Sequence, residues 1–284
     1  MSFERAQRRR AKARILIDGP SGSGKTKGAL LLAMGLGGKT AMIDTEHGSG
    51  SLYADTTEYD VVELKPPYSP EAYTKLIREA AAAGYEVLII DSISHEWAGS
   101  GGILESVDAA SGGPGGKFKA WGTATPRHND FVNTILAAPL HIICTVRSKQ
   151  DFALVEKDGG KKEVQKLGMA PITRDGMEYE FTCVLDVSVD RHMATSTKDR
   201  TGLFDGQHFK ITPEHGAKLR EWLESGAEPK PDPIIASRER IQKATSIAGL
   251  KGIWDSLSTA EQKALEADKN AQRDRLNKLE GATT

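Results

Sequence analysis

The chain has 284 residues, enough for one large domain with a small one, or for two modest domains. Its 38 Lys and Arg residues against 39 Asp and Glu residues give a net charge of −1, which argues against coating of nucleic acid by bulk charge but not against a local basic patch. No apolar run approaches the roughly 18–20 residues that cross a bilayer, so we expect no membrane association and a cytoplasmic location.

The first third of the chain predicts short apolar strands that alternate with helices. Residues 3–14 hold six basic side chains and one acidic one, and predict a basic helical arm. Apolar runs predict strands over 13–18, 40–44, 61–64 and 86–91, and helical spacing predicts helices over 26–36 and 70–83. Apolar strands separated by helices are typical of an α/β fold with a mainly parallel sheet.

The rest of the chain predicts further elements of this core and then a separate helical region. A glycine-rich stretch over 98–116 precedes a helix over 118–138 and a buried strand over 140–146. After them we expect a hairpin or mobile insertion over 148–176, a strand over 178–189 that pairs with 193–197, and a helix over 213–225. These elements divide the chain into an arm over 1–14, a core over 15–225, a proline-rich linker over 226–234 and a helical region over 235–284 punctuated by Gly249 and Gly252.

A glycine-rich turn between the first strand and the first helix matches the pattern G-x-x-x-x-G-K-[ST]. Glycines let consecutive backbone N–H groups wrap a phosphate, and the following helix adds its positive N-terminal end. In this pattern the lysine reaches the β- and γ-phosphates and the final hydroxyl ligates Mg²⁺. We therefore predict a nucleotide site formed by Gly19, Pro20, Ser21, Gly22, Ser23, Gly24, Lys25 and Thr26.

Two carboxylates at strand ends are candidates for the chemistry beside this phosphate site. Asp91 ends the strand over 86–91, where the second Mg²⁺-anchoring residue belongs, although many strands end in Asp only to cap a turn. Glu46 follows the strand over 40–44, and a carboxylate there can polarise the water that attacks the γ-phosphate. Asp44 competes for that role, and a solvated surface glutamate is the alternative for Glu46.

These motifs together resemble those of the RecA-like recombinases. The segment IDTEH over 43–47 is similar to the strand end that holds the catalytic glutamate in RecA, which favours Glu46, and LIIDS over 88–92 resembles that family's Walker B strand. Residues 142–149 fall where RecA has the strand leading to its glutamine switch and second DNA loop, although Thr145 stands at the glutamine position. The resemblance implies a RecA-like P-loop NTPase core with a small helical C-terminal domain, and a Mg-dependent ATPase with ATP and Mg²⁺ as cofactors.

The resemblance is closer to a phage-type branch of compact RecA-like ATPases implicated in single-strand annealing and recombination. It extends over about residues 1–225, and beyond the phosphate motif it includes HEW at 95–97, GGILE at 101–105, RSK at 147–149, RDGMEYE at 174–180 and KDRTGLF at 198–204. This resemblance implies an ATPase that acts on single-stranded DNA in phage-type recombination, annealing or repair, located in the bacterial host cytoplasm if phage-encoded. A single-strand-binding protein is then a candidate partner.

The same resemblance implies contacts between subunits. Lys198 and Arg200 stand at i and i+2 of an extended segment and so point to one side, and in RecA a lysine pair at the matching place reaches the γ-phosphate of the neighbour. Phe3 and Ala6 resemble the Phe-x-x-Ala peptide by which eukaryotic and archaeal recombinases dock on their neighbours. Both imply a homo-oligomer, a ring or a filament, with ATP at the interface. A solvated strand face and a helix packed on its own core are the alternatives.

DNA contacts are expected in two loops, over 98–117 and 148–176. The second loop carries six basic residues against five acidic ones, and Phe118, Trp121 and Phe152 could either stack on bases or belong to the core. The candidate DNA-binding residues are Arg147, Lys149, Lys161, Lys162 and Arg174.

Other functions also fit a P-loop sequence. A phosphotransferase is disfavoured because the chain has no arginine-rich lid segment. An ATP-driven motor and a nucleotide-gated assembly scaffold, neither acting on DNA directly, stay open. The ATPase rate with and without single-stranded DNA separates these two from a recombinase.

Overall fold

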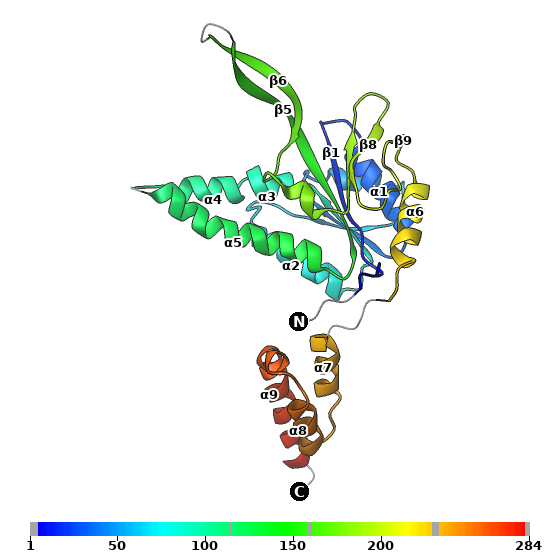
Figure 1. Cartoon of the computed structure of the whole chain (residues 1–284), viewed down its shortest axis with the longest axis vertical. Coiled ribbons are helices and arrows are strands. Elements are labelled where there is room, and N and C mark those ends of the chain that lie inside the picture. Colours follow the sequence, from blue (N-terminus) through cyan, green and yellow to red (C-terminus); the bar gives the residue numbers. More distant parts are fainter. Residues whose placement is uncertain (1–4, 114, 158–160, 229–232, 282–284) are drawn as a thin grey trace. The chain divides into compact units, whose positions relative to one another are not determined.

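The structure is a computed structural model that describes residues 5–113, 115–157, 161–228 and 233–281 (Figure 1). Side chains are described for these residues except 151–167, Pro233, Ile235 and 278–281. The chain divides into two compact units, Met1–Ala227 and Glu228–Thr284, each with its own hydrophobic core. Among the described residues, no helix combines the length and the apolar character that a bilayer span requires.

The first unit is built on a sheet that has nine strands within the described residues. The strand order is β3-β2-β4-β5-β1-β7-β8-β9, and β6 pairs with β5 outside this order. Neighbouring strands from β3 to β7 run parallel, whereas the β7–β8, β8–β9 and β5–β6 pairs are antiparallel. The predicted α/β fold with a mainly parallel sheet is therefore confirmed. The strands are β1 (Arg14–Gly19), β2 (Thr40–Asp44), β3 (Asp60–Glu63), β4 (Val87–Asp91), β5 (His141–Lys157), β6 (Lys161–Pro171), β7 (Cys183–Val187), β8 (Met193–Asp199) and β9 (His208–Lys210).

Helices cover both faces of this sheet because its central strands are apolar on both faces. Along β1, Ile15 and Ile17 pack in a cluster with residues of α1 (Lys25–Leu36) and α6 (Pro213–Glu224). Leu16, which lies between them, packs in a second cluster with residues of α2 (Pro70–Ala82) and α5 (Gly116–Ala137). Successive side chains of a strand point to opposite faces, so one apolar run supplies both layers of the core.

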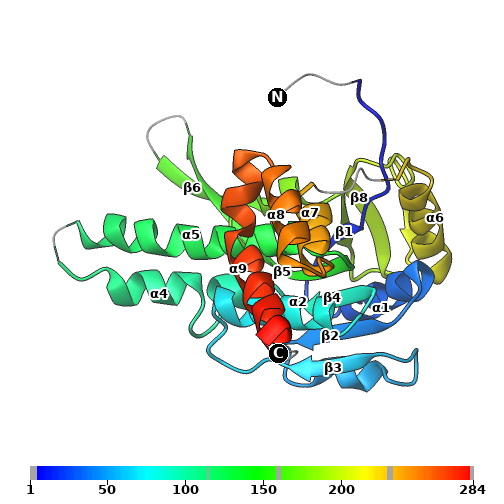
Figure 2. The same cartoon turned by 90° about the horizontal axis from the view of Figure 1, so that it is seen from below.

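Two extensions leave the core of the first unit. β5 continues beyond the sheet and forms with β6 a hairpin that begins at the pair Ser148 and Pro171 (Figure 1). α4 (Ile103–Ala110) and α5 lie side by side and project together (Figure 1, Figure 2). The prediction of a loop over 98–117 is therefore wrong over 103–110, because apolar residues at helical spacing let α4 pack on α5 through Ile103, Val107, Ala120 and Ala124.

The N-terminal arm forms no helix over residues 5–13, so the prediction of a helical arm is wrong. It lies along the C-terminal end of α6, where the Arg10 N–H donates to the Ala227 carbonyl (2.8 Å) and the Ala227 N–H donates to the Arg8 carbonyl (2.9 Å). The Arg8 guanidinium donates to the carbonyl oxygen of Trp222 and lies 4.8 Å from the centre of its ring. Cations are favourable beside the unpaired carbonyls at a helix C-terminus, and these contacts outweigh the helical propensity of the arm.

The strand predicted over 178–189 is shorter than expected. Its first residues form η2 (Met177–Glu180), a 3₁₀ turn that follows Gly176, whose φ of 88° favours glycine. β7 then covers only Cys183–Val187. It pairs with β8, as the sequence predicts, and the pair is antiparallel.

The second unit consists of α7 (Pro233–Gln242), α8 (Ile247–Asp255) and α9 (Thr259–Gly281). Gly249 and Gly252 lie inside α8, so the prediction that they punctuate the helical region is wrong. The chain instead turns before Ser246, whose Oγ accepts a hydrogen bond from the Gly249 N–H (3.1 Å) and so caps the start of α8. The buried apolar side chains of this unit are Ile241, Ala244, Leu250, Leu257, Leu265 and Leu276.

Arg14, at the start of β1, is a buried cation that is 6 % exposed and caps the end of α5. Its guanidinium donates to the carbonyl oxygens of Leu136 (2.9 Å), Ala138 (2.5 Å) and Leu140 (2.8 Å), and burial lowers its pKa to about 10. Arg14→Met leaves these acceptors without a donor, so we expect the free energy of unfolding to fall by about 1–3 kcal/mol. Urea unfolding followed by circular dichroism measures the change, with the exposed neighbour Lys12→Met as control. Equal midpoints for the two variants would contradict this role.

Candidate active site

The phosphate motif lies between the end of β1 and the start of α1, which is the strand–loop–helix context that it requires. Gly22 (φ 77°) and Gly24 (φ 94°) adopt the left-handed backbone region, which side chains disfavour. A Cβ atom on Gly19 would lie 2.5 Å from the carbonyl oxygen of Val187. Three glycines of the motif are thus required by the shape of the loop and by its close packing on β7.

Lys25 is the first residue of α1, and its amine folds back onto the backbone of the phosphate loop. Nζ donates to the carbonyl oxygens of Gly19 (2.7 Å) and Pro20 (2.9 Å). Burial lowers the pKa of Lys25, and the nearby carboxylates of Asp91 and Asp18 oppose that effect. The amine therefore lies at the mouth of the loop, held by carbonyl oxygens that a phosphate could replace.

Asp91 lies at the carboxyl end of β4 and is almost fully buried. The Thr26 hydroxyl donates to its Oδ2 atom (2.6 Å), and the Thr145 hydroxyl donates to its Oδ1 atom. Burial raises the pKa of Asp91, and these two hydrogen bonds oppose that effect. A carboxylate and a hydroxyl in direct contact supply the oxygen ligands that Mg²⁺ prefers, so Thr26 and Asp91 fit the metal that the motif implies.

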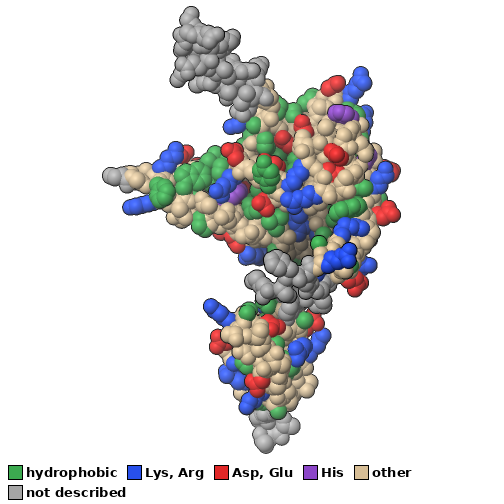
Figure 3. Space-filling view, viewed as in Figure 1, with side chains coloured by type: hydrophobic (Ala, Val, Ile, Leu, Met, Phe, Trp, Pro, Cys, Tyr) green, Lys and Arg blue, Asp and Glu red, His purple; other side chains and the backbone are tan. Residues whose placement is uncertain are grey.

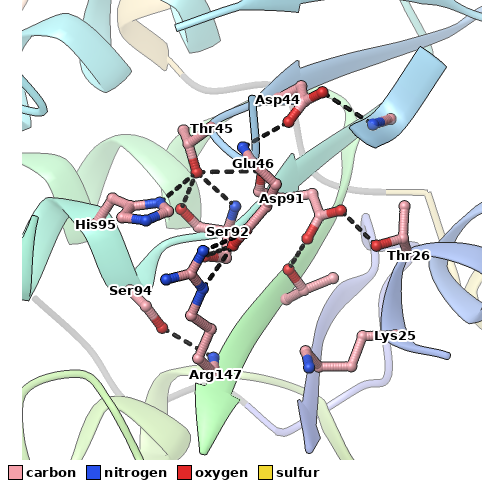
Figure 4. A network of polar contacts seen from close by, with 12 residues as sticks. Lys25, Thr26, Asp44, Thr45, Glu46, Asp91, Ser92, Ser94, His95 and Arg147 are labelled. Atoms are coloured by element: carbon pink, nitrogen blue, oxygen red, sulfur yellow. Dashed lines mark hydrogen bonds and ion pairs between the residues drawn. The ribbon is translucent and has the colours of Figure 1, made fainter. Parts of the chain in front are cut away.

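Glu46 lies just beyond β2, close to Asp91, and contacts a cation from β5 (Figure 4). The Arg147 Nε donates to Glu46 Oε1 (2.8 Å), its Nη2 donates to Oε2, and the Ser92 hydroxyl adds a third hydrogen bond to Oε1 (3.0 Å). Burial raises the pKa of Glu46, but the hydrogen bonds and charge of Arg147 outweigh it, so the net shift is downward. Arg147, a candidate DNA contact from the sequence, thus lies against the candidate base.

Asp44, the competitor for the role of base, has its carboxylate occupied by the backbone. Oδ1 accepts from the Glu46 N–H (2.6 Å), and Oδ2 accepts from the Gly50 N–H (2.9 Å). The side chain is fully buried at the end of β2. These contacts make Asp44 the residue that orients the segment carrying Glu46.

Thr45 links the ends of β2 and β4 and is missed by the sequence analysis (Figure 4). Its hydroxyl lies 2.9 Å from the Ser92 N–H and 2.7 Å from Nδ1 of His95, which is on α3 (Ser94–Ala98). Burial and the Arg147 charge lower the pKa of His95. Nothing in the sequence indicates these contacts, because they depend on the pairing of Asp44 with Asp91 across the two strands.

β5 contacts three acidic groups of the site through closely spaced side chains. Thr145 bonds to Asp91 and Arg147 to Glu46, and the Ser148 hydroxyl donates to Oδ1 of Asp18 (2.5 Å). The β5–β6 hairpin begins at Ser148. β5 therefore contributes side chains to the candidate site and also continues out of the core into the β5–β6 hairpin.

Lys198 and Arg200 lie at the end of β8 and reach the same acceptor. Lys198 Nζ (2.6 Å) and Arg200 Nη2 (2.9 Å) both donate to the carbonyl oxygen of Tyr179 in η2. The two side chains thus point to one side, as their spacing predicts. Their contact with a neighbouring subunit stays a prediction.

The remaining candidates do not converge with these residues. Lys149 is exposed near the base of the hairpin, and Arg174 Nη1 donates to Oδ1 of Asn129 (3.3 Å). Ala6 is exposed on the arm. Phe3 and the side chains of Lys161 and Lys162 lie outside the described residues.

Residues 11–220 match a protein family described as an AAA domain (AAA_24). No curated protein matches the chain. The match indicates a P-loop ATPase domain and does not single out the phage-type recombinase branch.

Proposed function

Since the chain belongs to the AAA domain family and its P-loop ATPase domain spans residues 11–220, we propose that it hydrolyses Mg·ATP with Glu46 as general base and acts on single-stranded DNA. The observation that carries the catalytic part is the meeting of the phosphate loop, Asp91 and Glu46 at one edge of the sheet (Figure 4). Phosphoryl transfer to water needs a fixed phosphate site, a metal-holding carboxylate and a group that positions the water.

The phosphates of ATP bind to the backbone N–H groups of the loop and to the N-terminal end of α1. Lys25 leaves the carbonyl oxygens of Gly19 and Pro20 and turns to the β- and γ-phosphates. Thr26 and Asp91 would hold Mg²⁺, and the metal would neutralise phosphate charge. Lys25, Thr26 and Asp91 would thus exchange hydrogen bonds within the protein for contacts with the phosphates or the metal.

Glu46 accepts a proton from the attacking water at a carboxylate oxygen. In the described conformation both oxygens of this carboxylate accept hydrogen bonds from Arg147, which lowers the pKa of Glu46 and weakens it as a base. Withdrawal of Arg147 leaves the Glu46 carboxylate with the Ser92 hydrogen bond and raises its proton affinity. Turnover is therefore coupled to the position of Arg147 at the base of the β5–β6 hairpin.

The DNA part of the proposal is supported by the two extensions of the first unit. Thr145, Arg147 and Ser148 link the site to the hairpin, so a ligand that moves the hairpin changes the surroundings of the base. On the other extension, Phe118 is 86 % exposed between two exposed lysines at the start of α5. Figure 3 shows hydrophobic side chains gathered over α4 and α5. Exposed aromatic and basic side chains together suit stacking on bases and contact with phosphates.

We further propose that the chain forms a ring or filament in which Lys198 and Arg200 reach the γ-phosphate bound to the next subunit. The support is their common direction at the end of β8 and the resemblance of their segment to the recombinases. A single-strand-binding protein is the partner that this role would bring to the same DNA.

The ATPase rate with and without an unstructured single-stranded oligonucleotide tests the DNA part. We expect stimulation by the oligonucleotide, and we expect Lys149→Ala to reduce by about 1 the slope of log affinity for DNA against log salt, because one phosphate contact is lost. Lys75→Ala, an exposed lysine on α2, serves as the control that leaves this slope unchanged. A rate that is indifferent to DNA would contradict the proposal and favour a motor or a nucleotide-gated scaffold.

A further inference from the structure

The turn between β7 and β8 contacts the phosphate loop through a histidine. Nδ1 of His192 donates to the carbonyl oxygen of Ser23 (3.0 Å). A Cβ atom built on Gly24 would lie 3.5 Å from the same nitrogen, so the imidazole lies directly beside the loop backbone at this position. The turn that joins β7 to β8 thus packs, through His192, against the backbone of the phosphate loop.

The backbone of this turn is unusual in a way that fixes the histidine. Arg191 (φ 55°) and His192 (φ 54°) both adopt the left-handed region, which is uncommon for two successive residues other than glycine. The turn is held by the Ser188 N–H, which donates to the Met193 carbonyl (2.9 Å), and by the Ser188 hydroxyl, which donates to the Asp190 carbonyl (2.8 Å). Strained conformations of this kind persist where the surroundings determine them, and they concentrate at functional sites.

The hydrogen bond to Ser23 determines the direction of a neighbouring N–H group. The peptide group that joins Ser23 and Gly24 is planar, so its C=O and its N–H point in opposite directions. A carbonyl held by His192 on one side of the loop therefore directs the Gly24 N–H to the other side. The Ser23 side chain offers no alternative anchor, because its buried hydroxyl has no hydrogen-bond partner among the described residues.

We propose that His192 is a positioning residue for nucleotide binding, which holds the Ser23–Gly24 peptide so that the Gly24 N–H donates to a phosphate of ATP. The inference rests on the proposed ATPase function and adds to it a residue outside the phosphate motif. Its effect is on the affinity for the triphosphate, because the hydrogen bond orients a donor that binds the ground state and the transition state alike.

Two side chains of similar size, asparagine and aspartate, separate the effect of the hydrogen bond from the effect of side-chain volume at position 192. In His192→Asn the amide Nδ2–H replaces the Nδ1–H donor, and asparagine accepts the left-handed region more readily than most residues. In His192→Asp the carboxylate has a similar shape but only accepts hydrogen bonds, so it repels the Ser23 carbonyl. His192→Gly removes the donor without strain and serves if His192→Asp fails to fold.

Titration with a fluorescent ATP analogue and steady-state kinetics provide the test. We expect His192→Asp or His192→Gly to raise both the dissociation constant and KM about tenfold with kcat little changed, and His192→Asn to stay near the original values. Equal affinity in all variants would overturn the inference. A loss of affinity in His192→Asn as large as in the others would also overturn it, since a donor at this position would then not matter.

Lys25→Ala distinguishes this outcome from failure of the proposed function. If Lys25→Ala loses the analogue while His192→Asp and His192→Gly retain it, only the role of His192 is wrong. If the unmodified chain itself binds no ATP analogue, the proposed ATPase function fails and the inference fails with it.

Discussion

Glu46→Gln is expected to lower the ATPase rate by about 10²–10⁴-fold while ATP binding persists. The amide keeps the shape of the carboxylate but cannot take a proton from the attacking water. The substitution also replaces the ion pair between Glu46 and Arg147 by a weaker contact between an amide and a guanidinium. Retained binding of ATP would therefore show that the phosphate loop binds nucleotide without this ion pair. Turnover measured under saturating ATP, together with equilibrium binding of an ATP analogue, gives both quantities.

The matched control is Glu63→Gln, because Glu63 lies at the end of β3 beside Asp44 and is exposed. It changes a carboxylate at the same edge of the sheet without touching Arg147 or Ser92, so we expect its turnover to stay at the original rate. Normal turnover in Glu46→Gln would remove Glu46 as the base and return the role to Asp44 or to another group.

Arg200→Ala is expected to lose about 10³–10⁵ in turnover with ATP affinity roughly intact, if Arg200 meets the γ-phosphate of a neighbouring subunit. In this variant the negative charge that develops on the γ-phosphoryl group in the transition state lacks its cationic partner, whereas binding of ATP in the ground state does not depend on that partner. Within one chain, Arg200 contacts the carbonyl oxygen of Tyr179, so the variant also removes one hydrogen bond to η2. Lys210→Ala removes an exposed cation on β9, at the other end of β8, and serves as the control.

A mixture of Arg200→Ala with Glu46→Gln tests the shared site directly. At an interface formed by one subunit of each kind, Glu46 comes from one chain and Arg200 from the other, so partial ATPase recovery is expected. The mixture must first be shown to co-assemble, for example by co-purification of a tagged variant with an untagged one. A co-assembled mixture without recovery would mean that Arg200 acts within its own chain or only supports η2.

The phosphate loop and the end of β4 are the parts of the site that local sequence was sufficient to predict. Gly22 and Gly24 occupy backbone conformations that glycine adopts with little strain, so the spacing of the glycines predicts the backbone conformation of the phosphate loop. Asp91 follows a short apolar run with β-branched residues, a pattern that predicts a buried strand. For the same reason the α/β class could be predicted, since apolar runs of strand length between helices leave few other arrangements.

Two segments adopt a conformation that their local sequence does not predict, because contacts with a distant segment outweigh their propensity. Residues 5–13 have the composition of a basic helix, yet Arg8 and Arg10 contact carbonyl oxygens at the end of α6, and that contact is not encoded near the arm. The stretch over 98–117 has many glycines, but α4 forms because its apolar residues pack on α5. In both cases burial or helix capping supplied by another segment decides the conformation.

The sequence by itself determined which residues could bind phosphate and metal, because each of those signals lies within a few positions of the chain. Only the tertiary structure decided what surrounds the candidate base. Glu46 meets Ser92 and Arg147, which are 46 and 101 positions away, because β2, β4 and β5 are adjacent in the sheet. His192 reaches the phosphate loop from 169 positions away because β7 pairs with β1. Strand order and register are properties of the whole hydrophobic core, so no local pattern could have predicted these contacts.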